Sequence, residues 1–342
     1  VDPFFGQKDL KAKTIRTVGS AATRFQEDYS RMLRAVRFAS RFGFSISEKT
    51  AAAIKKMAHH LHDKLGDEWI VSRETLSQEF LKAFDARPRF CIELMDELNL
   101  LETVFPELKA LQACKQTPPY HTEGTAFDHV LLSLDTTETT TLTAWFPDPI
   151  PLLSKLAILF HDLGKPAAAT EQDGVIHFYG HEKIGASMVS ELCDRLNLGS
   201  TAYYPFAYEQ LAWIIREHMF AIKRKSQLTK ATLLERTFFS KKHFGQSLLH
   251  TMLADQLASI PAETTNNTLP ILTLLERLRK LAPDGMLPPP LISGDDVLEW
   301  TDIKPGPRIA EALDDVRERQ LTGEFAGRAQ AETYVKNAYG TQ

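Results

Sequence analysis

A histidine and an aspartate, His161 and Asp162, stand side by side at the end of the apolar stretch 152–160, and the tetrapeptide Leu-Gly-Lys-Pro follows them. A polar pair at the end of a buried helix costs free energy unless something compensates it. A divalent metal ion would do so, because imidazole and carboxylate groups are both suitable ligands. The glycine and the proline would end the helix, which places Lys165 where it could meet a phosphate.

Four more residues of ligand-forming types recur at intervals of 20 to 37 residues around this pair: His129, His181, His218 and Asp255. In an antiparallel helical bundle, a helix, a loop and the returning helix take roughly 30 to 40 residues, so this spacing brings the chain back to one level. The set is therefore predicted to converge on one site. The competing interpretation, a hydrogen-bonded core or surface residue, applies to any lone histidine and is kept for His59, His60, His62, His121, His177, His243 and His250.

Arginines form a stripe near the beginning of the chain. Residues 1–60 hold twelve Lys and Arg against five Asp and Glu, a balance of +7, whereas the whole chain carries −4 and the remainder therefore −11. Four arginines recur at spacings of three and four beside an apolar side, which predicts one amphipathic helix. The members of the stripe are Arg31, Arg34, Arg37 and Arg41. A solvated face is the simpler interpretation of such a stripe, but the preceding Glu27-Asp28 favours a functional one.

Apolar residues recur with the three-to-four period of a helix almost everywhere, and strand-like alternation is scarce. Only residues 174–179 look extended, and the glycines that bound them favour a loop or a short hairpin. The predicted fold class is therefore all-α. Proline-rich breaks near 117–119, 262–270 and 287–290 mark candidate domain edges.

The composition is that of an ordinary globular chain of two to three domains: 342 residues, 43% hydrophobic and 25% charged. The overall charge argues against a uniformly basic nucleic-acid coat. Three widely spaced cysteines make a disulfide framework improbable and fit a reducing cytoplasm. No apolar stretch approaches the roughly 20 residues of a membrane span, so no membrane partner is expected.

The pair His161-Asp162 resembles the signature of the HD-domain metal-dependent phosphohydrolases, and the ordered set with His129, His181, His218 and Asp255 resembles the pattern of members that hold two metals. The resemblance implies that these six residues bind metal, with Asp162 anchoring or bridging the ions. It also implies that His161, Asp162 and Lys165 are catalytic, with Lys165 stabilising phosphate charge. Mg²⁺, Mn²⁺, Ni²⁺ or Co²⁺ would serve as the ion, activating water for attack on phosphorus.

The flanking segments are similar to the bacterial tRNA nucleotidyltransferase and poly(A) polymerase family of class II, in the part that follows the polymerase head. The segments that carry the similarity are 2–6, 16–19, 27–31, 33–39, 105–108, 120–121, 291–296 and 304–307. Two positions depart from the family pattern: Phe5 stands where a second glycine is frequent, and Trp300-Thr301 where Leu-Gly is usual. By this resemblance the polymerase carboxylates, which use Mg²⁺, lie in an amino-terminal head that is missing here.

The resemblance also assigns the motif EDxxR, formed here by Glu27, Asp28 and Arg31. Asp28 and Arg31 would recognise the Watson-Crick edge of CTP or ATP, and Glu27 would orient Arg31. One helical turn separates positions 28 and 31, so both side chains share a face. The structural alternative is a capping carboxylate with a surface ion pair. Arg34, Arg37 and Arg41 would contact tRNA phosphates or brace the head.

Together these inferences predict an all-helical chain of four parts. They are the end of the head with the neck helices (1–65), a helical body (66–117), an HD helical bundle (118–265) and a helical tail that contacts tRNA (266–342). The preferred hypothesis is the portion of an enzyme that adds or repairs the 3′-terminal CCA of tRNA with CTP and ATP. The alternatives are a stand-alone HD phosphohydrolase acting on 2′,3′-cyclic or other phosphoesters, and a non-catalytic tRNA-binding fragment.

Overall fold

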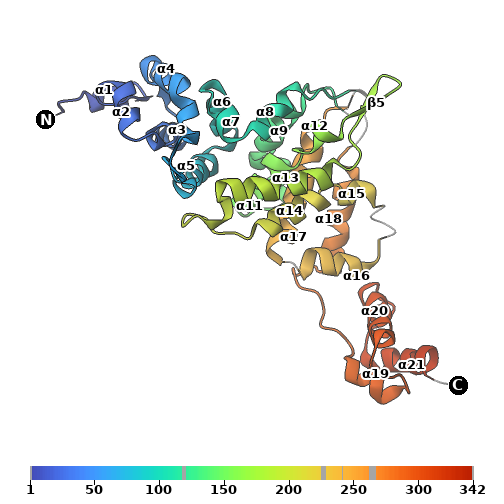
Figure 1. The fold of residues 1–342 in the computed structure, drawn as a ribbon. Helices are drawn as coiled ribbons and strands as arrows, with labels where there is room; N and C mark the ends of the chain where they lie inside the picture. Colours follow the sequence, from blue (N-terminus) through green and yellow to red (C-terminus); the bar gives the residue numbers. More distant parts are fainter. Residues whose placement is uncertain (1, 118–120, 225–228, 241, 262–266, 341–342) are drawn as a thin grey trace. The chain divides into compact units, whose positions relative to one another are not determined.

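The computed structural model describes residues 2–117, 121–224, 229–240, 242–261 and 267–340. Helices dominate it, which confirms the predicted all-α class (Figure 1). The chain forms two compact units, residues 1–219 with 250–267 and residues 220–249 with 268–342. This division by contacts does not test the four-part division predicted above, which stays a prediction.

The elements of the first unit are mainly short helices, among which the labels η1 to η4 mark the 3-10 helices. They begin with α1 (Gly6–Lys11), β1 (Thr14–Ile15), α2 (Ala21–Glu27), α3 (Ser30–Phe42), β2 (Ser45–Ile46), α4 (Glu48–Met57), η1 (Ala58–His62), β3 (Lys64–Leu65), β4 (Glu68–Trp69), α5 (Arg73–Ala86), α6 (Pro88–Glu97), α7 (Leu100–Val104), α8 (Pro106–Ala110) and η2 (Leu111–Ala113). They continue with α9 (Ala126–Asp135), η3 (Thr136–Glu138), α10 (Thr140–Trp145), α11 (Leu152–Phe160), α12 (Lys165–Ala168), β5 (Thr170–Gln172), β6 (Val175–His177), α13 (His181–Leu196), η4 (Leu198–Ser200), α14 (Tyr208–Glu217) and the second half of α17 (Lys242–Ala258).

The predicted arginine helix is α3, and its ends follow from local chemistry. The Asp28 carboxylate accepts hydrogen bonds from the backbone N and the hydroxyl of Ser30, which satisfies donors of the first turn. At the other end Gly43 adopts a left-handed φ of 66°, which glycine tolerates without strain. The apolar face, including Met32 and Val36, is buried, and α3 packs on α5.

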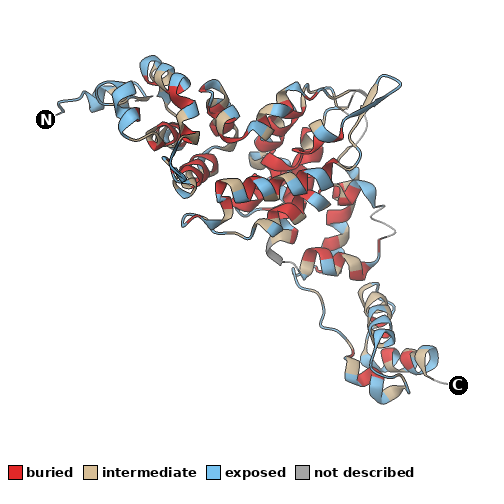
Figure 2. Ribbon diagram, in the orientation of Figure 1, coloured by how far each residue is buried: buried red, intermediate tan, exposed pale blue. Residues whose placement is uncertain are grey.

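The ligand candidates lie in, or directly after, four helices of the first unit and the second half of a fifth. These helices are α9, α11, α13, α14 and α17. Helix α9 packs on α11, and α13 packs on α14. Figure 2 shows buried residues concentrated along these helices. Helix α9 begins at a capping box in which the side chains and backbones of Thr125 and Asp128 bond each other.

The segment predicted to be extended forms a real hairpin, which confirms that prediction. Strands β5 and β6 pair antiparallel, with Gln172 opposite Val175, and Asp173 and Gly174 make the turn with positive φ values of 52° and 77°. Two other strand pairs, β1 with β2 and β3 with β4, contain only two residues each. Alternation cannot be recognised over two residues, so the sequence did not indicate them.

The second unit has its own small core. Its elements are α15 (Phe220–Lys223), the first half of α17, α16 (Ala231–Leu234), the π-helix η6 (Glu235–Phe239), α18 (Leu269–Leu281), α19 (Gly294–Trp300), α20 (Pro307–Leu321) and α21 (Arg328–Tyr339). Helices α19, α20 and α21 bury Val297, Val316 and Val335 together. Glu318 of α20 accepts hydrogen bonds from the first backbone N–H groups of α16.

Among the described residues, no helix combines the length and apolarity that crossing a membrane requires. The three cysteines are buried thiols that form no disulfide.

His250 supplies a test of the core. It packs against Phe146, shares a hydrogen bond of 2.9 Å with Ser154, and burial lowers its pKa to about 4. Because the unfolded chain binds a proton near pH 6.5, stability is lost as the pH falls from 6.5 to 4. At about 1.4 kcal/mol per pKa unit, His250 accounts for up to about 3 kcal/mol of that loss. Denaturant unfolding of His250→Asn at several pH values should show a correspondingly weaker acid dependence; an unchanged dependence would contradict this assignment.

Candidate functional site

The pair His161 and Asp162 lies where α11 ends. Every residue of α11 except Lys155 is buried, so the helix carries the pair into the interior, where both side chains are almost fully inaccessible. The chain then turns, and α12 begins at Lys165. A Cβ on Gly164 would overlap the carbonyl oxygen of His181 and lie 2.6 Å from the backbone N of Gly185. The missing side chain therefore lets α13 approach closely.

The structure brings all six predicted metal ligands together. His129 lies in the first turn of α9, His181 is the first residue of α13, His218 follows the last residue of α14, and Asp255 belongs to α17. All of them are buried. Two groups have ligand atoms within 4.8 Å of one another: His129 with His161 and Asp255, and Asp162 with His181 and His218.

All four histidines of the cluster turn Nε2 inward, and three of them fix the ring through the same kind of backbone contact. In each of these three, Nδ1 donates to the carbonyl of the residue three positions earlier, which leaves Nε2 facing the cluster. The bonds join His161 to Ile158 (2.8 Å), His181 to Phe178 (2.8 Å) and His218 to Ile215 (2.6 Å). His161 and His218 each follow the end of a helix, where carbonyl groups lack helical partners.

The facing nitrogens fit a cation. Nε2 of His181 lies 3.1 Å from Nε2 of His218. Burial lowers the pKa of both rings, that of His218 to about 3, so both are neutral near pH 7. Since their protons are on Nδ1, two lone pairs face each other beside the carboxylate of Asp162, 3.4 Å from Nε2 of His181. This donor set is consistent with a site for a divalent metal ion.

The carboxylates of the cluster are held in their ionised form. Burial opposes ionisation of Asp255, but the hydrogen bond from His129 and the charge of His161 outweigh it and lower its pKa. For Asp162, too, burial is outweighed, by the charges of His161 and Lys165, and its pKa is lowered. Ionised carboxylates are the form that binds a metal ion.

Lys165 is buried beside Asp162. Its Nζ lies 2.7 Å from Oδ2 of Asp162, donates to the side chain of Gln116 at 2.6 Å, and stands 5.4 Å from the centre of the Phe178 ring. The contact between Nζ and Oδ2 is close enough for an ion pair but does not have the angles of a hydrogen bond. Oδ2 of Asp162 therefore accepts no hydrogen bond. Lys165 thus contacts the cluster through Asp162, and its predicted role beside a substrate phosphate stays a prediction.

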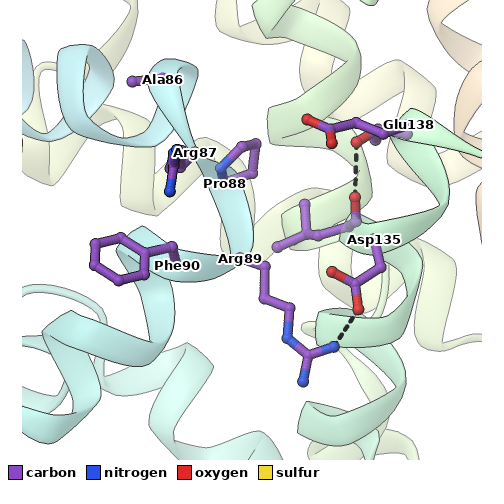
Figure 3. A pocket seen from close by; sticks show the side chains of 9 residues that line it. Ala86, Arg87, Pro88, Arg89, Phe90, Asp135 and Glu138 are labelled. Atoms are coloured by element: carbon purple, nitrogen blue, oxygen red, sulfur yellow. Dashed lines mark hydrogen bonds and ion pairs between the residues drawn. The ribbon is translucent and has the colours of Figure 1, made fainter. Parts of the chain in front are cut away.

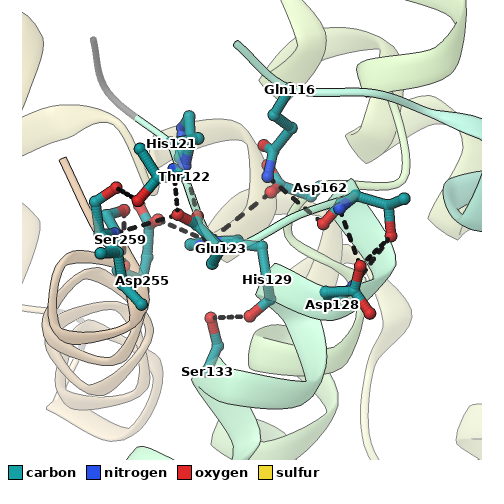
Figure 4. A network of polar contacts seen from close by, with 12 residues as sticks. Gln116, His121, Thr122, Glu123, Asp128, His129, Ser133, Asp162, Asp255 and Ser259 are labelled. Atoms are coloured by element: carbon teal, nitrogen blue, oxygen red, sulfur yellow. Dashed lines mark hydrogen bonds and ion pairs between the residues drawn. The ribbon is translucent and has the colours of Figure 1, made fainter. Parts of the chain in front are cut away.

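Sequence reasoning missed one residue of the cluster, Glu123. Its buried carboxylate contacts Nδ1 of His129 and Nδ1 of His121 (Figure 4). No ligand-like spacing pointed to it. The side chain of His243 lies outside the described residues.

At the other predicted site, Glu27 forms an ion pair with Arg31. Oε2 of Glu27 lies 2.6 Å from Nη1 of Arg31, which also donates to the carbonyl of Arg24. This ion pair lowers the pKa of Glu27. Asp28 lies 3.9 Å from Nε of Arg31 and caps α3. These contacts are compatible with both interpretations of the motif, nucleotide recognition and a capping carboxylate with a surface ion pair.

The rest of the arginine stripe faces the protein as well as solvent. Arg37 donates to Glu79 of α5 at 3.1 Å, and Nε of Arg34 lies 3.9 Å from the same carboxylate. The guanidinium of Arg41 stands 5.8 Å from the ring of Phe42. The Arg37 side chain is 20% exposed and that of Arg34 43%, so Arg34 is the better placed for an external phosphate.

A surface pocket of about 330 Å³ lies between the start of α6 and the end of α9 (Figure 3). Arg89 spans it and pairs with both Glu93 and Asp135. No predicted site residue lines it, and its arginine already has two carboxylate partners, so we assign it no function.

The comparisons agree with this geometry. Residues 120–258 match the HD domain family, and residues 43–112 match the family described as "Probable RNA and SrmB- binding site of polymerase A". The helical bundle with its histidine and aspartate cluster is therefore an HD domain.

Relatives extend the match over the whole chain. The chain is 29% identical to the A-adding tRNA nucleotidyltransferase of Deinococcus radiodurans, with 98% of this chain and 74% of the relative covered. It is 31% identical to the multifunctional CCA protein of Neisseria gonorrhoeae, with 78% and 60% covered. The chain belongs to the class II CCA-adding and poly(A) polymerase family, and it matches the C-terminal part of these enzymes.

Solved structures show the same fold. The CCA-adding enzyme of Bacillus stearothermophilus in complex with CTP has a TM-score of 0.58 at 21% identity, with 98% of this chain and 68% of that chain covered. The Thermotoga maritima enzyme complexed with tRNA has a TM-score of 0.55 at 18% identity, with 99% and 67% covered. The chain thus spans about two thirds of the length of these proteins.

The close approach at Gly164 is testable. In Gly164→Ala, the added methyl would push α13 and His181 away, so the free energy of unfolding should fall by about 1–3 kcal/mol. Gly327→Ala is the control, because nothing lies within 4 Å of a Cβ there and its φ of −164° suits any residue. Denaturant unfolding of both variants measures the difference. Equal free energies of unfolding for Gly164→Ala and Gly327→Ala would show that the close approach at Gly164 does not contribute to stability.

Proposed function

We propose that this chain is the portion of a tRNA nucleotidyltransferase that carries a metal-dependent phosphohydrolase site in its HD domain. The whole enzyme would add or repair the 3′-terminal CCA of tRNA with CTP and ATP in the cytoplasm. The observation that carries the phosphohydrolase part is the pair of neutral histidines whose lone pairs face each other beside Asp162. The family membership supports the nucleotidyltransferase part.

In this proposal His129, His161 and Asp255 hold one divalent ion, and Asp162, His181 and His218 hold a second or share the first. The candidate ions are Mg²⁺, Mn²⁺, Ni²⁺ and Co²⁺, and the four imidazoles favour a transition metal such as Ni²⁺ over Mg²⁺. When bound, such an ion supplies Lewis-acid chemistry that activates water and polarises a phosphoryl group. The anchored Nδ1 atoms keep each Nε2 directed at the ion, and burial keeps the rings of His181 and His218 neutral near pH 7.

Lys165 has two roles in the proposal. Its ammonium group keeps Asp162 ionised. The same group donates a hydrogen bond to Gln116, which holds it in place beside the Asp162 carboxylate. Substrate phosphate would compete for the same ammonium group, which stabilises its negative charge. The substrates best suited to the site are 2′,3′-cyclic phosphates and related phosphoesters.

Asp162 tests the phosphohydrolase. Asp162→Asn removes the only carboxylate of one ligand group, which also lies 3.3 Å from Nε2 of His161 in the other group. Hydrolysis of 2′,3′-cyclic AMP with Mn²⁺ or Ni²⁺ should therefore fall by more than about 100-fold, beyond the roughly 10–100-fold that a lost outer contact costs. Asp135→Asn is the matched control, since it makes the same change on α9 outside the cluster. Activity that survives Asp162→Asn would exclude this mechanism and favour a non-catalytic HD domain.

The nucleotide site carries the second part of the proposal. The ion pair of 2.6 Å between Glu27 and Arg31 fixes the guanidinium at the start of α3, where Asp28 lies one turn away. Together Arg31 and Asp28 would read the base of CTP or ATP, and Arg34, Arg37 and Arg41 would face tRNA or the polymerase head. The carboxylates that bind Mg²⁺ for nucleotidyl transfer belong to that head.

Arg31→Ala should weaken CTP and ATP binding by this chain. A bidentate contact to a base edge is worth about 1–3 kcal/mol, which corresponds to roughly 5-fold to 150-fold in Kd. Arg16→Ala is the control, because Arg16 forms only an exposed ion pair with Asp9. Calorimetric titration with each nucleotide measures the change. Equal affinities in the two variants, or no binding by the wild type, would argue against nucleotide selection by these residues.

The two remaining hypotheses predict different results. A stand-alone HD phosphohydrolase would hydrolyse phosphoesters but show no dependence on Arg31 in nucleotide binding. A non-catalytic tRNA-binding fragment would bind tRNA with a steep salt dependence and take up no metal.

A further inference from the structure

Glu123 is a fully buried acid whose two oxygens contact different parts of the first unit. Oε1 accepts hydrogen bonds from Nδ1 of His129 at 2.9 Å and Nδ1 of His121 at 2.6 Å. Oε2 accepts from the backbone N of Thr122 at 3.0 Å and the backbone N of Ile260 at 3.1 Å. Four donors thus converge on one carboxylate (Figure 4).

His129 needs such an acceptor because of its place in the fold. The other three histidines use backbone carbonyl groups at helix boundaries to fix Nδ1. His129 lies within α9, whose carbonyl groups accept the hydrogen bonds of the helix itself; its own N–H donates to the carbonyl of Thr125. A side chain from the preceding turn therefore takes the place of the carbonyl.

The other oxygen ties the same turn to the helix of Asp255. Ile260 lies two residues beyond the end of α17, and its carbonyl accepts from the backbone N and the hydroxyl of Thr122 at 2.8 and 2.9 Å. His129 and Asp255, whose ligand atoms lie 3.1 Å apart, come from segments 126 residues apart in the sequence. Glu123 and Thr122 join the two segments next to these ligands.

We propose that Glu123 is a positioning residue of the metal centre: its carboxylate holds Nδ1 of His129 so that Nε2 faces the ion, and it fixes the α17 end beside Asp255. The inference rests on the metal site of the proposed function. When a carboxylate accepts the hydrogen bond of Nδ1, the metal-binding Nε2 becomes more basic, and hence a stronger ligand, than when a backbone carbonyl accepts that bond. The half of the centre with His129, His161 and Asp255 is thereby the tighter half.

An amide at position 123 cannot reproduce this arrangement. With its oxygen toward the two histidines, a glutamine would aim its NH₂ group at the backbone N–H groups of Thr122 and Ile260. With the amide reversed, the NH₂ group would face Nδ1 of both histidines. One side therefore loses its acceptor in either orientation, although the shape of the side chain is preserved.

The test is Mn²⁺ titration calorimetry of the metal-stripped 342-residue chain. Glu123→Gln should raise the Kd of the tighter binding event by roughly 10–100-fold. The matched control is Asp128→Asn, which changes a carboxylate of the same turn that bonds only Thr125 and can keep that bond with its amide oxygen. Circular dichroism of each variant shows whether the fold is kept.

Histidine nitrogen NMR of the Zn²⁺-loaded protein separates positioning from mere stabilisation. In the wild type and in Asp128→Asn, Nδ1 of His129 should carry a slowly exchanging proton. In Glu123→Gln that proton should exchange faster while the Nδ1 protons of His161, His181 and His218 stay unchanged. The proposal would be overturned by a Kd of Glu123→Gln for Mn²⁺ within twofold of the wild type. An equal change in the exchange rates of the Nδ1 protons of all four histidines would also overturn it. Failure of the wild-type chain to bind Mn²⁺ would overturn both this inference and the proposed metal site.

Discussion

Asp162 and Asp255 are buried, and a buried carboxylate is stable only where positive charge or hydrogen-bond donors surround it. In this protein those groups are Lys165 on one side and the rings of His129 and His161 on the other. The remaining pair, His181 and His218, stays neutral and offers lone pairs. The cluster thus combines compensated carboxylates with the lone pairs of two neutral rings, a set of groups that is consistent with a metal site.

The bundle achieves this by placing ligands at helix boundaries. His161 and His218 follow the last residues of α11 and α14, and His181 begins α13. The last carbonyl groups of α11 and α14 lack helical partners, and the carbonyl of Phe178 lies in the turn before α13, so each ring can fix one nitrogen with backbone alone and present the other. Gly164 then permits α13 to approach the turn that carries Asp162. The arrangement needs little from other side chains except at His129, where a carboxylate replaces the carbonyl.

The sequence was informative wherever a function required a residue type at a local spacing. His161 with Asp162 ended an apolar helix, and helix-and-return intervals indicated the other ligands; α3 and the hairpin of β5 and β6 were local patterns as well. Glu123 was not recognisable, because its partner Ile260 is 137 residues away and is contacted through backbone. Glu79 was missed for the same reason, since it meets Arg37 across 42 residues. Formal charge consequently overstated how much of the arginine stripe faces solvent.

Helix α13 links the two family matches physically. Its first residue, His181, belongs to the metal cluster, and near its other end Arg195 holds both carboxylate oxygens of Glu107 at 2.7 and 2.9 Å. The carbonyl of Leu196 accepts a buried hydrogen bond of 2.6 Å from Ser77 in α5. One guanidinium nitrogen held between two carboxylate oxygens, together with a buried hydroxyl hydrogen bond, leaves the helix little freedom to slide. The region that matches an RNA-binding family and the HD cluster therefore share one rigid element, so a displacement of α5 or α8 would move His181 directly.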